Sequence, residues 1–177
     1  VFSAIKKDAK VVLVGDVDQL PSVGAGNVLS DVISSGVPTI HLQQIFRQAM
    51  ESQIVTNAHR TNNGLPLAID STKEDFYFIE EDNIERVAGY VVASVQRFLN
   101  KGYKLSDILV LAPMKKGQAG IHKLNEQIQA KVNPPSTSKN EWKLKTRVFR
   151  EGDKIMQTRN DYEKGVSNGD IGIVVSI

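Results

Sequence analysis

Short apolar runs alternate with amphipathic stretches along most of the chain. Two continuous apolar runs, Val11–Val14 and Ile108–Ala112, have the pattern of strands that are buried on both faces of a parallel sheet. Thr39–Leu42 and Phe76–Ile79 are shorter strand candidates. Because strands that alternate with helices build parallel sheets with helices on both faces, the pattern predicts an α/β fold. The predicted helices lie around Leu29–Ile33 and over residues 51–62, 84–99 and 121–128.

The last part of the chain has a different pattern. Residues 136–141 form a polar stretch that we interpret as a linker, and residues 144–158 predict two short strands around Glu151-Gly152-Asp153. Asn168-Gly169 is a strong signal for a tight turn, and an apolar strand is expected over 171–177. The sequence therefore predicts a small β insertion at this end of the chain.

Composition and charge narrow the function classes. The 177 residues include no cysteine, which excludes disulfides, thiolate zinc sites and iron–sulfur clusters and fits a reducing compartment such as the cytoplasm. No apolar run reaches the ~20 residues that cross a bilayer, so no membrane association is expected. The net charge of +2 combines −4 over residues 1–100 with +6 over residues 101–177. A basic half can bind a polyanion, and it can equally be a solvated lysine surface.

The loop after the first predicted strand carries chemistry. Asp16, Asp18 and Gln19 lie beyond the carboxyl end of that strand, where open α/β sheets bind ligands. The Gln19 amide offers both a donor and an acceptor, which suits a phosphate oxygen together with an attacking water. A structural βα loop, with Asp16 capping the following turn, is the alternative.

Several motifs occur in the order expected for one family. The stretch GDVDQLPSVGAGNVL (residues 15–29) resembles motif III of the RecD-like helicases of superfamily 1, which include the exodeoxyribonuclease V alpha subunit. The stretch LQQIFRQ (residues 42–48) resembles their motif IV. Further similar segments are Ala58–Gly64, Val110–Gly117, Leu124–Glu126, Asn133-Pro134, Gly152–Gln157 and Asn160–Gly172.

The resemblance implies an ATP-driven motor with two RecA-like domains of the P-loop NTPase type. ATP and Mg²⁺ would bind between these domains, and single-stranded DNA would run across them. The nucleotide loop would contain Asp16, Asp18 and Gln19, with Gln19 sensing the γ-phosphate. Arg47 and Gln48 would also face the nucleotide, and Gln19 and Arg47 are the candidate catalytic residues. A surface ion pair is the alternative role for Arg47.

Other parts of such a motor are missing from these residues. The phosphate loop G-x-x-x-x-G-K-[ST] does not occur, and neither do the family's motifs V and VI. We therefore expect an internal fragment that neither hydrolyses ATP nor unwinds DNA and holds no cofactor tightly. Its expected parts are the end of the first motor domain (1–48), the start of the second (49–163) and a truncated small β insertion (164–177).

Basic residues suggest where DNA would bind. Lys115 and Lys116 follow Pro113-Met114 between a predicted strand and helix, and Gly117 and Gly120 should leave backbone amides open as a phosphate seat. The resemblance places residues 113–116 near the DNA track, and a solvated helix cap is the alternative. Asn160 lies in another loop that matches the family, and we include it among the candidate DNA contacts.

A second basic stretch contains two aromatic residues. Trp142 in the polar linker is a candidate for base stacking, whereas the alternating pattern around Phe149 indicates a core position. No histidine has metal-ligand spacing, so no metal site is predicted. The basic residues of this stretch are Lys143, Lys145, Arg147, Arg150, Lys154 and Arg159.

Two function classes remain. The first is a fragment of an ATP-dependent DNA helicase of DNA repair or recombination, of 5′-to-3′ polarity by resemblance. Its partners would be single-stranded DNA and subunits of a nuclease or recombination complex. The second is a non-enzymatic α/β module that binds single-stranded DNA or a partner subunit. A phosphate loop elsewhere in the parent protein would discriminate the first class from the second.

Overall fold

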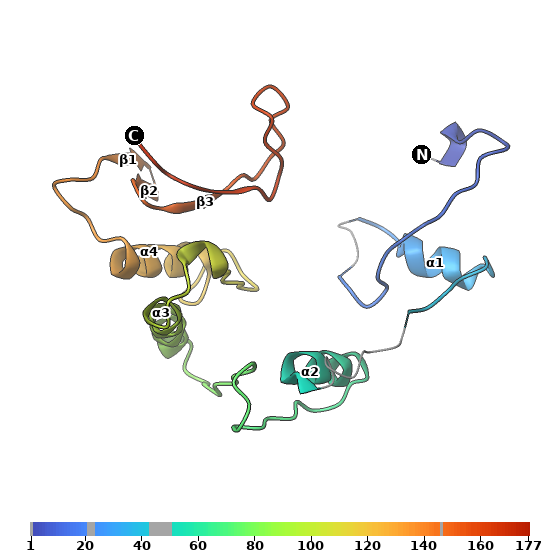
Figure 1. Cartoon of the computed structure of the whole chain (residues 1–177), viewed down its shortest axis with the longest axis horizontal. Helices are drawn as coiled ribbons and strands as arrows, with labels where there is room; N and C mark the ends of the chain where they lie inside the picture. Colours follow the sequence, from blue (N-terminus) through green and yellow to red (C-terminus); the bar gives the residue numbers. More distant parts are fainter. Residues whose placement is uncertain (1, 21–23, 43–50, 146) are drawn as a thin grey trace. The chain divides into compact units, whose positions relative to one another are not determined.

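The computed structural model describes residues 2–20, 24–42, 51–145 and 147–177 (Figure 1). The chain divides into two compact units, Val1–Ile79 and Glu80–Ile177, and each is described by itself. Within the described ranges, no helix combines the length and apolar character needed to cross a membrane.

The described residues of unit 1 form a 3-10 turn, η1 (Phe2–Ala4), and two helices, α1 (Val28–Ser34) and α2 (Gln53–Asn62). The helix predicted around Leu29–Ile33 is confirmed as α1, and Gly36 follows its end with a φ of +85°. That left-handed conformation favours glycine, which explains the stop. The second predicted helix is confirmed, but it begins at Gln53 because Ser52 is its N-cap and accepts a hydrogen bond from the Val55 N–H at 3.4 Å.

Two buried amides join α2 to the extended segment that follows it. The Gln53 side chain donates to the Asp70 carbonyl and accepts from the Asp70 N–H, both at 2.7 Å. One helical turn later, Asn57 donates to the Ala68 carbonyl at 2.9 Å and accepts from the Ala68 N–H at 2.7 Å. Each amide thus replaces the strand partner that this backbone would otherwise need.

Unit 2 begins with two helices that pack against each other, α3 (Ile84–Asn100) and α4 (Ile121–Val132) (Figure 1). Both predicted helices are confirmed. Asn83 caps α3 by accepting from the Glu85 N–H at 2.9 Å. A short 3-10 turn, η3 (Leu105–Asp107), lies between them. Among the described residues, the buried apolar side chains are Ala88 and Val95 of α3 and Leu124 of α4.

Four short strands complete the described part of unit 2. The antiparallel pairs are β1 (Glu141–Leu144) with β2 (Arg147–Arg150), and β3 (Lys154–Met156) with β4 (Ile171–Ile173). The two strands predicted around 151–153 are confirmed as β2 and β3, although they pair with β1 and β4 rather than with each other. The prediction of a linker up to residue 141 is wrong at its end, because β1 begins there and includes Trp142.

The strands predicted for the parallel sheets are not confirmed. The four apolar segments form no ladder with any other described residue. Val12 and Val14 are 83% and 93% exposed, and Leu111 is 84% exposed. A strand exists only when another backbone supplies its hydrogen bonds, so apolar sequence alone does not produce one. The segments concerned are residues 11–14, 39–42, 76–79 and 108–112.

Candidate functional site

Asp16 organises the loop that carries the candidate nucleotide-sensing residues. Its Oδ1 accepts from the Asp18 N–H at 3.0 Å, and its Oδ2 accepts from Gln19 Nε2 at 2.9 Å. The structure therefore brings together the three residues that the sequence singled out here. With its N–H group directed at Asp16, Gln19 has one amide orientation, and its Oε1 remains available for a further partner. All three residues are exposed.

Gly15 allows this loop to lie close to α1. A Cβ atom at position 15 would lie 2.7 Å from Leu29 Cδ2, closer than such atoms approach. A glycine here therefore serves close packing of the loop against the helix rather than an unusual backbone angle. Two later glycines of the same loop, Gly24 and Gly26, have φ angles of +153° and +92°, so their conformations also favour glycine.

The other half of the predicted nucleotide site is outside the described residues. Arg47 and Gln48 belong to the undescribed range 43–50. Their distance from Gln19 and their approach to a phosphate stay predictions.

The loop at residues 113–117 lies against the start of α4. The Ile121 N–H donates to the Met114 carbonyl at 3.0 Å, and the His122 N–H donates to the Lys115 carbonyl at 3.2 Å. The predicted phosphate seat is wrong for Gly120, whose N–H donates to the Gly117 carbonyl at 3.1 Å. The first amides of α4 also have acceptors. The Lys115 and Lys116 side chains remain exposed, as do Pro113 and Met114, the latter at 50%.

Asn160 stabilises its own loop. Its Oδ1 accepts from the Asn168 N–H at 2.8 Å, and its Nδ2 donates to the Tyr162 hydroxyl at 3.2 Å. Asp161 and Val166 form a β-bridge that closes the loop beyond β3. The loop presents Tyr162, which is 87% exposed. A DNA contact by Asn160 stays a prediction, and both of its amide groups already have a partner.

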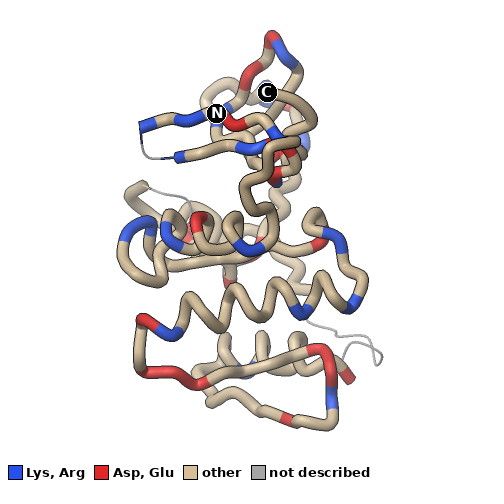
Figure 2. The backbone as a smooth tube through the Cα atoms, turned by 90° about the vertical axis from the view of Figure 1, so that its left-hand side faces the viewer, with Lys and Arg blue, Asp and Glu red and all other residues tan. Residues whose placement is uncertain are grey.

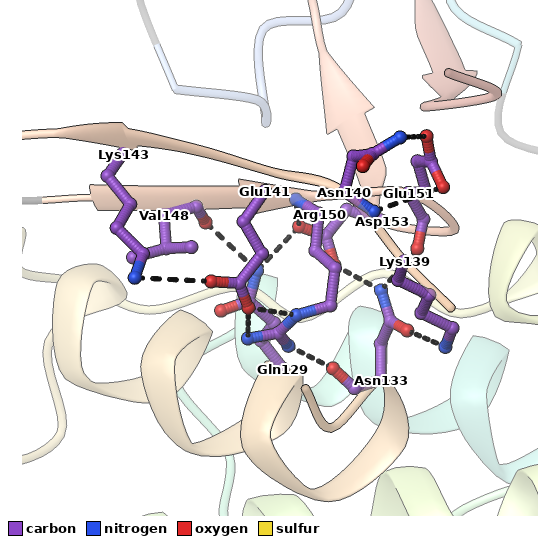
Figure 3. Close-up of polar contacts among 10 residues, drawn as sticks. All are labelled: Gln129, Asn133, Lys139, Asn140, Glu141, Lys143, Val148, Arg150, Glu151 and Asp153. Carbon is purple, nitrogen blue, oxygen red and sulfur yellow. Dashed lines mark hydrogen bonds and ion pairs between the residues drawn. The ribbon is translucent and has the colours of Figure 1, made fainter. Parts of the chain in front are cut away.

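Arg150 belongs to the second basic stretch in the sequence, but its side chain is buried and bonded within unit 2. It is only 6% exposed, and its Nε and Nη2 donate to Glu141 Oε1 at 2.7 and 2.6 Å (Figure 3). Its Nη1 donates to the Asn133 carbonyl at the end of α4. The hydrogen bond from Arg150 holds the pKa of the Glu141 carboxyl below its ordinary value, and the charges of Arg150 and Lys143 add to this effect. Arg150 therefore ties the hairpin to α4.

Asp153 is a second residue at which hydrogen bonds between α4 and the hairpin converge. It is 9% exposed and accepts hydrogen bonds from the Arg150 N–H at 2.8 Å, from Asn133 Nδ2 at 2.7 Å and from Gln129 Nε2 at 2.5 Å (Figure 3). Gln129 Nε2 also donates to the Val148 carbonyl at 2.9 Å. These hydrogen bonds offset the free-energy cost of burying the carboxylate. They also join α4 and the β1–β2 hairpin into one structural unit.

Lys154 is also engaged within unit 2. Its Nζ donates to the Ile108 carbonyl at 2.6 Å and to the Ser106 carbonyl at 3.3 Å. Two residues of the second basic stretch, Arg150 and Lys154, are therefore engaged within unit 2. The exposed basic residues of that stretch are Lys143, Lys145, Arg147 and Arg159.

Sequence reasoning missed the pairing of Trp142 with Phe149. The register of the hairpin places these residues opposite each other, and their rings stack at 5.8 Å between centroids and 29° between planes. Trp142 is 56% exposed, and Phe149 is half-buried rather than part of a core. The same register also pairs Glu141 with Arg150.

Among the described residues, no three carboxylate or histidine side chains converge as metal ligands would. In the nucleotide loop, both Asp16 oxygens are engaged by Asp18 and Gln19.

Comparison with known proteins gives two family matches, one at each end of the chain. Residues 1–82 match the AAA domain, and residues 124–177 match the SH3 domain of ATP-dependent RecD-like DNA helicases. The ATP-dependent RecD2 DNA helicase of Deinococcus radiodurans is 34% identical over 174 residues, which are 98% of this chain. This chain resembles the RecD-like DNA helicases. The resemblance that motifs III and IV predicted is thus confirmed, and the AAA match indicates a P-loop NTPase fold for residues 1–82.

Two further relatives are named as the RecD subunit of a RecBCD enzyme. The RecBCD enzyme subunit RecD of Mycolicibacterium smegmatis is 28% identical over 190 residues, or 99% of this chain, and that of Mycobacterium tuberculosis is 26% identical over 98% of it. The chain spans 23% of the length of the Deinococcus protein and 33% and 32% of the two RecD subunits. The RecD-like SH3 match begins inside α4, so it includes the Gln129 and Asn133 ends of the Arg150–Asp153 network.

Proposed function

We propose that this chain is part of an ATP-dependent RecD-like DNA helicase that acts in DNA repair or recombination. The observation that carries the proposal is the order of the two family matches, an AAA domain followed by a RecD-like helicase SH3 domain. The similarity to the Deinococcus helicase over 98% of the chain supports it. The absence of cysteine fits work in the cytoplasm.

In this helicase, Gln19 would sense the γ-phosphate, and Asp16 would set the orientation of its amide. Arg47 would direct its guanidinium to the same phosphate, where a planar fork fits oxygen pairs that lysine cannot bind in the same way. ATP with Mg²⁺ supplies the phosphoryl group whose hydrolysis drives movement. The rest of the protein would provide the phosphate loop, since none occurs in these 177 residues.

The apolar segments 11–14 and 108–112 would each belong to a parallel sheet of a RecA-like domain. Their exposed valines and leucines support this assignment, because such runs are stable when both faces are covered. The resulting boundaries would be 1–48 for the first motor domain, 49–163 for the second and 164–177 for the β insertion. Translocation would have 5′-to-3′ polarity, by resemblance to the family.

Single-stranded DNA would contact Lys115 and Lys116, whose side chains are exposed at the start of α4. Pro113, Met114 and Asn160 would lie along the same track. The partner assembly of the helicase would be a nuclease or recombination complex, since the two mycobacterial relatives are named RecBCD subunits.

The decisive experiment measures DNA-stimulated ATP hydrolysis and unwinding by the complete helicase with Gln19→Ala and Arg47→Ala. We expect Arg47→Ala to lower kcat by ~10³-fold or more with nucleotide binding retained. Gln19→Ala should uncouple ATP hydrolysis from DNA binding. Normal ATPase activity in both variants would contradict the assignment. The 177-residue chain alone should show no ATPase activity.

A second candidate is a non-enzymatic module that binds single-stranded DNA or a partner subunit. The missing phosphate loop favours it for the chain in isolation. Single-strand binding by a parent protein that has no phosphate loop anywhere would support this alternative over the helicase.

A further inference from the structure

We propose that the outward face of the β1–β2 hairpin is a base-stacking platform for single-stranded DNA, with Trp142 as its centre. The inference rests on the proposed function in taking DNA as the ligand, and it adds a specific binding surface. The platform consists of Trp142, Leu144, Arg147 and Phe149, with Lys145 at the adjoining turn.

The register of the hairpin defines two faces. Trp142 pairs with Phe149 and Leu144 pairs with Arg147, so these four side chains share one face. The opposite face carries Glu141 and Arg150, which are bonded to each other, and Arg150 is also bonded to α4. The platform therefore faces away from α4.

The aromatic pair on this face is accessible. The two rings are nearly parallel, at 29°, and Trp142 retains 56% of its surface. Leu144 beside it is 44% exposed. A flat indole supported from one side by Phe149 offers its other surface to a base, and stacking of this kind tolerates any base sequence.

The charge around the pair matches a phosphate backbone. Lys145 and Arg147 are exposed, and neither forms an ion pair with another residue of the described part of the chain. Between Glu141 and Glu151 the hairpin contains no acidic residue. Figure 2 shows basic positions on both strands of this hairpin near its turn. Aromatic rings beside cations are the combination by which proteins hold single strands.

The experiment uses the tryptophan itself as a probe, because Trp142 is the only tryptophan of the chain. The 177-residue protein is titrated with oligo(dT), while intrinsic fluorescence and the anisotropy of a labelled strand are followed in parallel. We expect quenching that saturates together with the anisotropy. A duplex of the same length should quench much less, because its bases are already stacked.

Variants separate stacking from charge. Trp142→Ala should weaken binding of the labelled strand roughly 5- to 150-fold, and Trp142→Phe should retain most of the affinity. Arg147→Gln should weaken binding and reduce its salt dependence. Tyr90→Ala removes an aromatic ring that is 43% exposed on α3, and this matched control should change nothing.

Three results would overturn the platform. The first is strand binding without quenching, and the second is a Trp142→Ala variant that binds as tightly as Tyr90→Ala. In both cases the proposed DNA-binding function survives through other residues such as Lys115 and Lys116. The third is quenching that depends on protein concentration in the absence of DNA, which would assign the face to a second copy of the chain.

Discussion

Arg150 donates two hydrogen bonds to a single carboxylate oxygen of Glu141, from Nε at 2.7 Å and from Nη2 at 2.6 Å. The same guanidinium reaches the Asn133 carbonyl at the end of α4. One side chain thus satisfies groups from a strand and from a helix. Its removal would leave both the carboxylate and the carbonyl without this donor.

The first prediction concerns Arg150→Ala. We expect the free energy of unfolding to fall by about 1–3 kcal/mol, because the buried Asn133 carbonyl loses its donor. Urea unfolding followed by the fluorescence of Trp142 measures this change. Arg147→Ala removes an exposed arginine from the same strand and should change the stability by less than about 0.5 kcal/mol. Equal effects of the two variants would contradict the structural role of Arg150.

The second prediction concerns acid stability. The hydrogen bond from Arg150 lowers the pKa of Glu141 in the folded state below its ordinary value of 4.5. Since the folded pKa is the lower one, the stabilisation is complete above the unfolded pKa and is lost as the pH falls through the folded pKa. The stability difference between the wild-type chain and Glu141→Gln should therefore be largest near neutral pH and shrink in acid. Urea midpoints from about pH 7 to pH 3 test this.

Glu163→Gln is the matched control for this pH series. Glu163 is exposed near the tip of the loop beyond β3, and its neutralisation also removes one negative charge. A difference from wild type that shrinks in acid in the same way for both variants would indicate a general charge effect instead of the Glu141–Arg150 pair.

The third prediction concerns Asn57, which is 3% exposed and holds both backbone groups of Ala68. Asn57→Ala should destabilise unit 1 by about 2 kcal/mol, because two hydrogen bonds are lost and buried groups remain unpaired. Hydrogen exchange at the Ala68 N–H should accelerate accordingly. His59→Ala, at an exposed position of the same helix, should leave that exchange rate unchanged. An unchanged rate in Asn57→Ala would contradict the pairing.

The fourth prediction concerns the two exposed lysines at the start of α4. If both contact phosphates, Lys115→Ala combined with Lys116→Ala should reduce the slope of log K against log salt by about 1.4 for single-stranded DNA. Fluorescence anisotropy at several salt concentrations measures the slope. The double variant Lys6→Ala with Lys7→Ala removes the same charge from unit 1 and should leave the slope unchanged. Equal slopes in the two double variants would remove residues 115 and 116 from the DNA track.

The fifth prediction concerns the coupling of Asp16 to Gln19. In the complete helicase, Asp16→Ala should lower the DNA-stimulated kcat by ~10- to 100-fold, because the Gln19 amide loses its orienting acceptor. If Asp16 acts through Gln19, the double variant with Gln19→Ala should be no slower than Gln19→Ala alone. Multiplicative effects in this cycle would show that the two residues act independently.

Local signals in the sequence predicted the helices well. Gly36 and Gly102 adopt φ angles of +85° and +95° just after α1 and α3. Because glycine favours this conformation, the ends of both helices could be predicted from these glycines. The start of α3 likewise depends on Asn83, whose side chain caps the helix. Such effects lie within a few residues, which is why a single sequence reveals them.

Pairing between distant segments was harder to predict. Strand patterns located β2 and β3, but their partners depend on tertiary contacts, and the apolar run at 108–112 forms no ladder among the described residues. In the candidate site, Asp16 and Gln19 are three residues apart, so their contact was within reach of local reasoning. The burial of Arg150 could not be predicted by local reasoning, because it requires the end of α4 to lie against the hairpin.

α4 links the loop at residues 113–117 to the β1–β2 hairpin. Its first amides are bonded to the Met114 and Lys115 carbonyls, and its last turn is bonded to Arg150 and Asp153 through Asn133. A helix of 12 residues is about 18 Å long and stiff. Hydrogen bonds therefore fix both ends of this helix to neighbouring segments. A displacement of residues 113–117 at one end of α4 should therefore be transmitted to the β1–β2 hairpin at the other end.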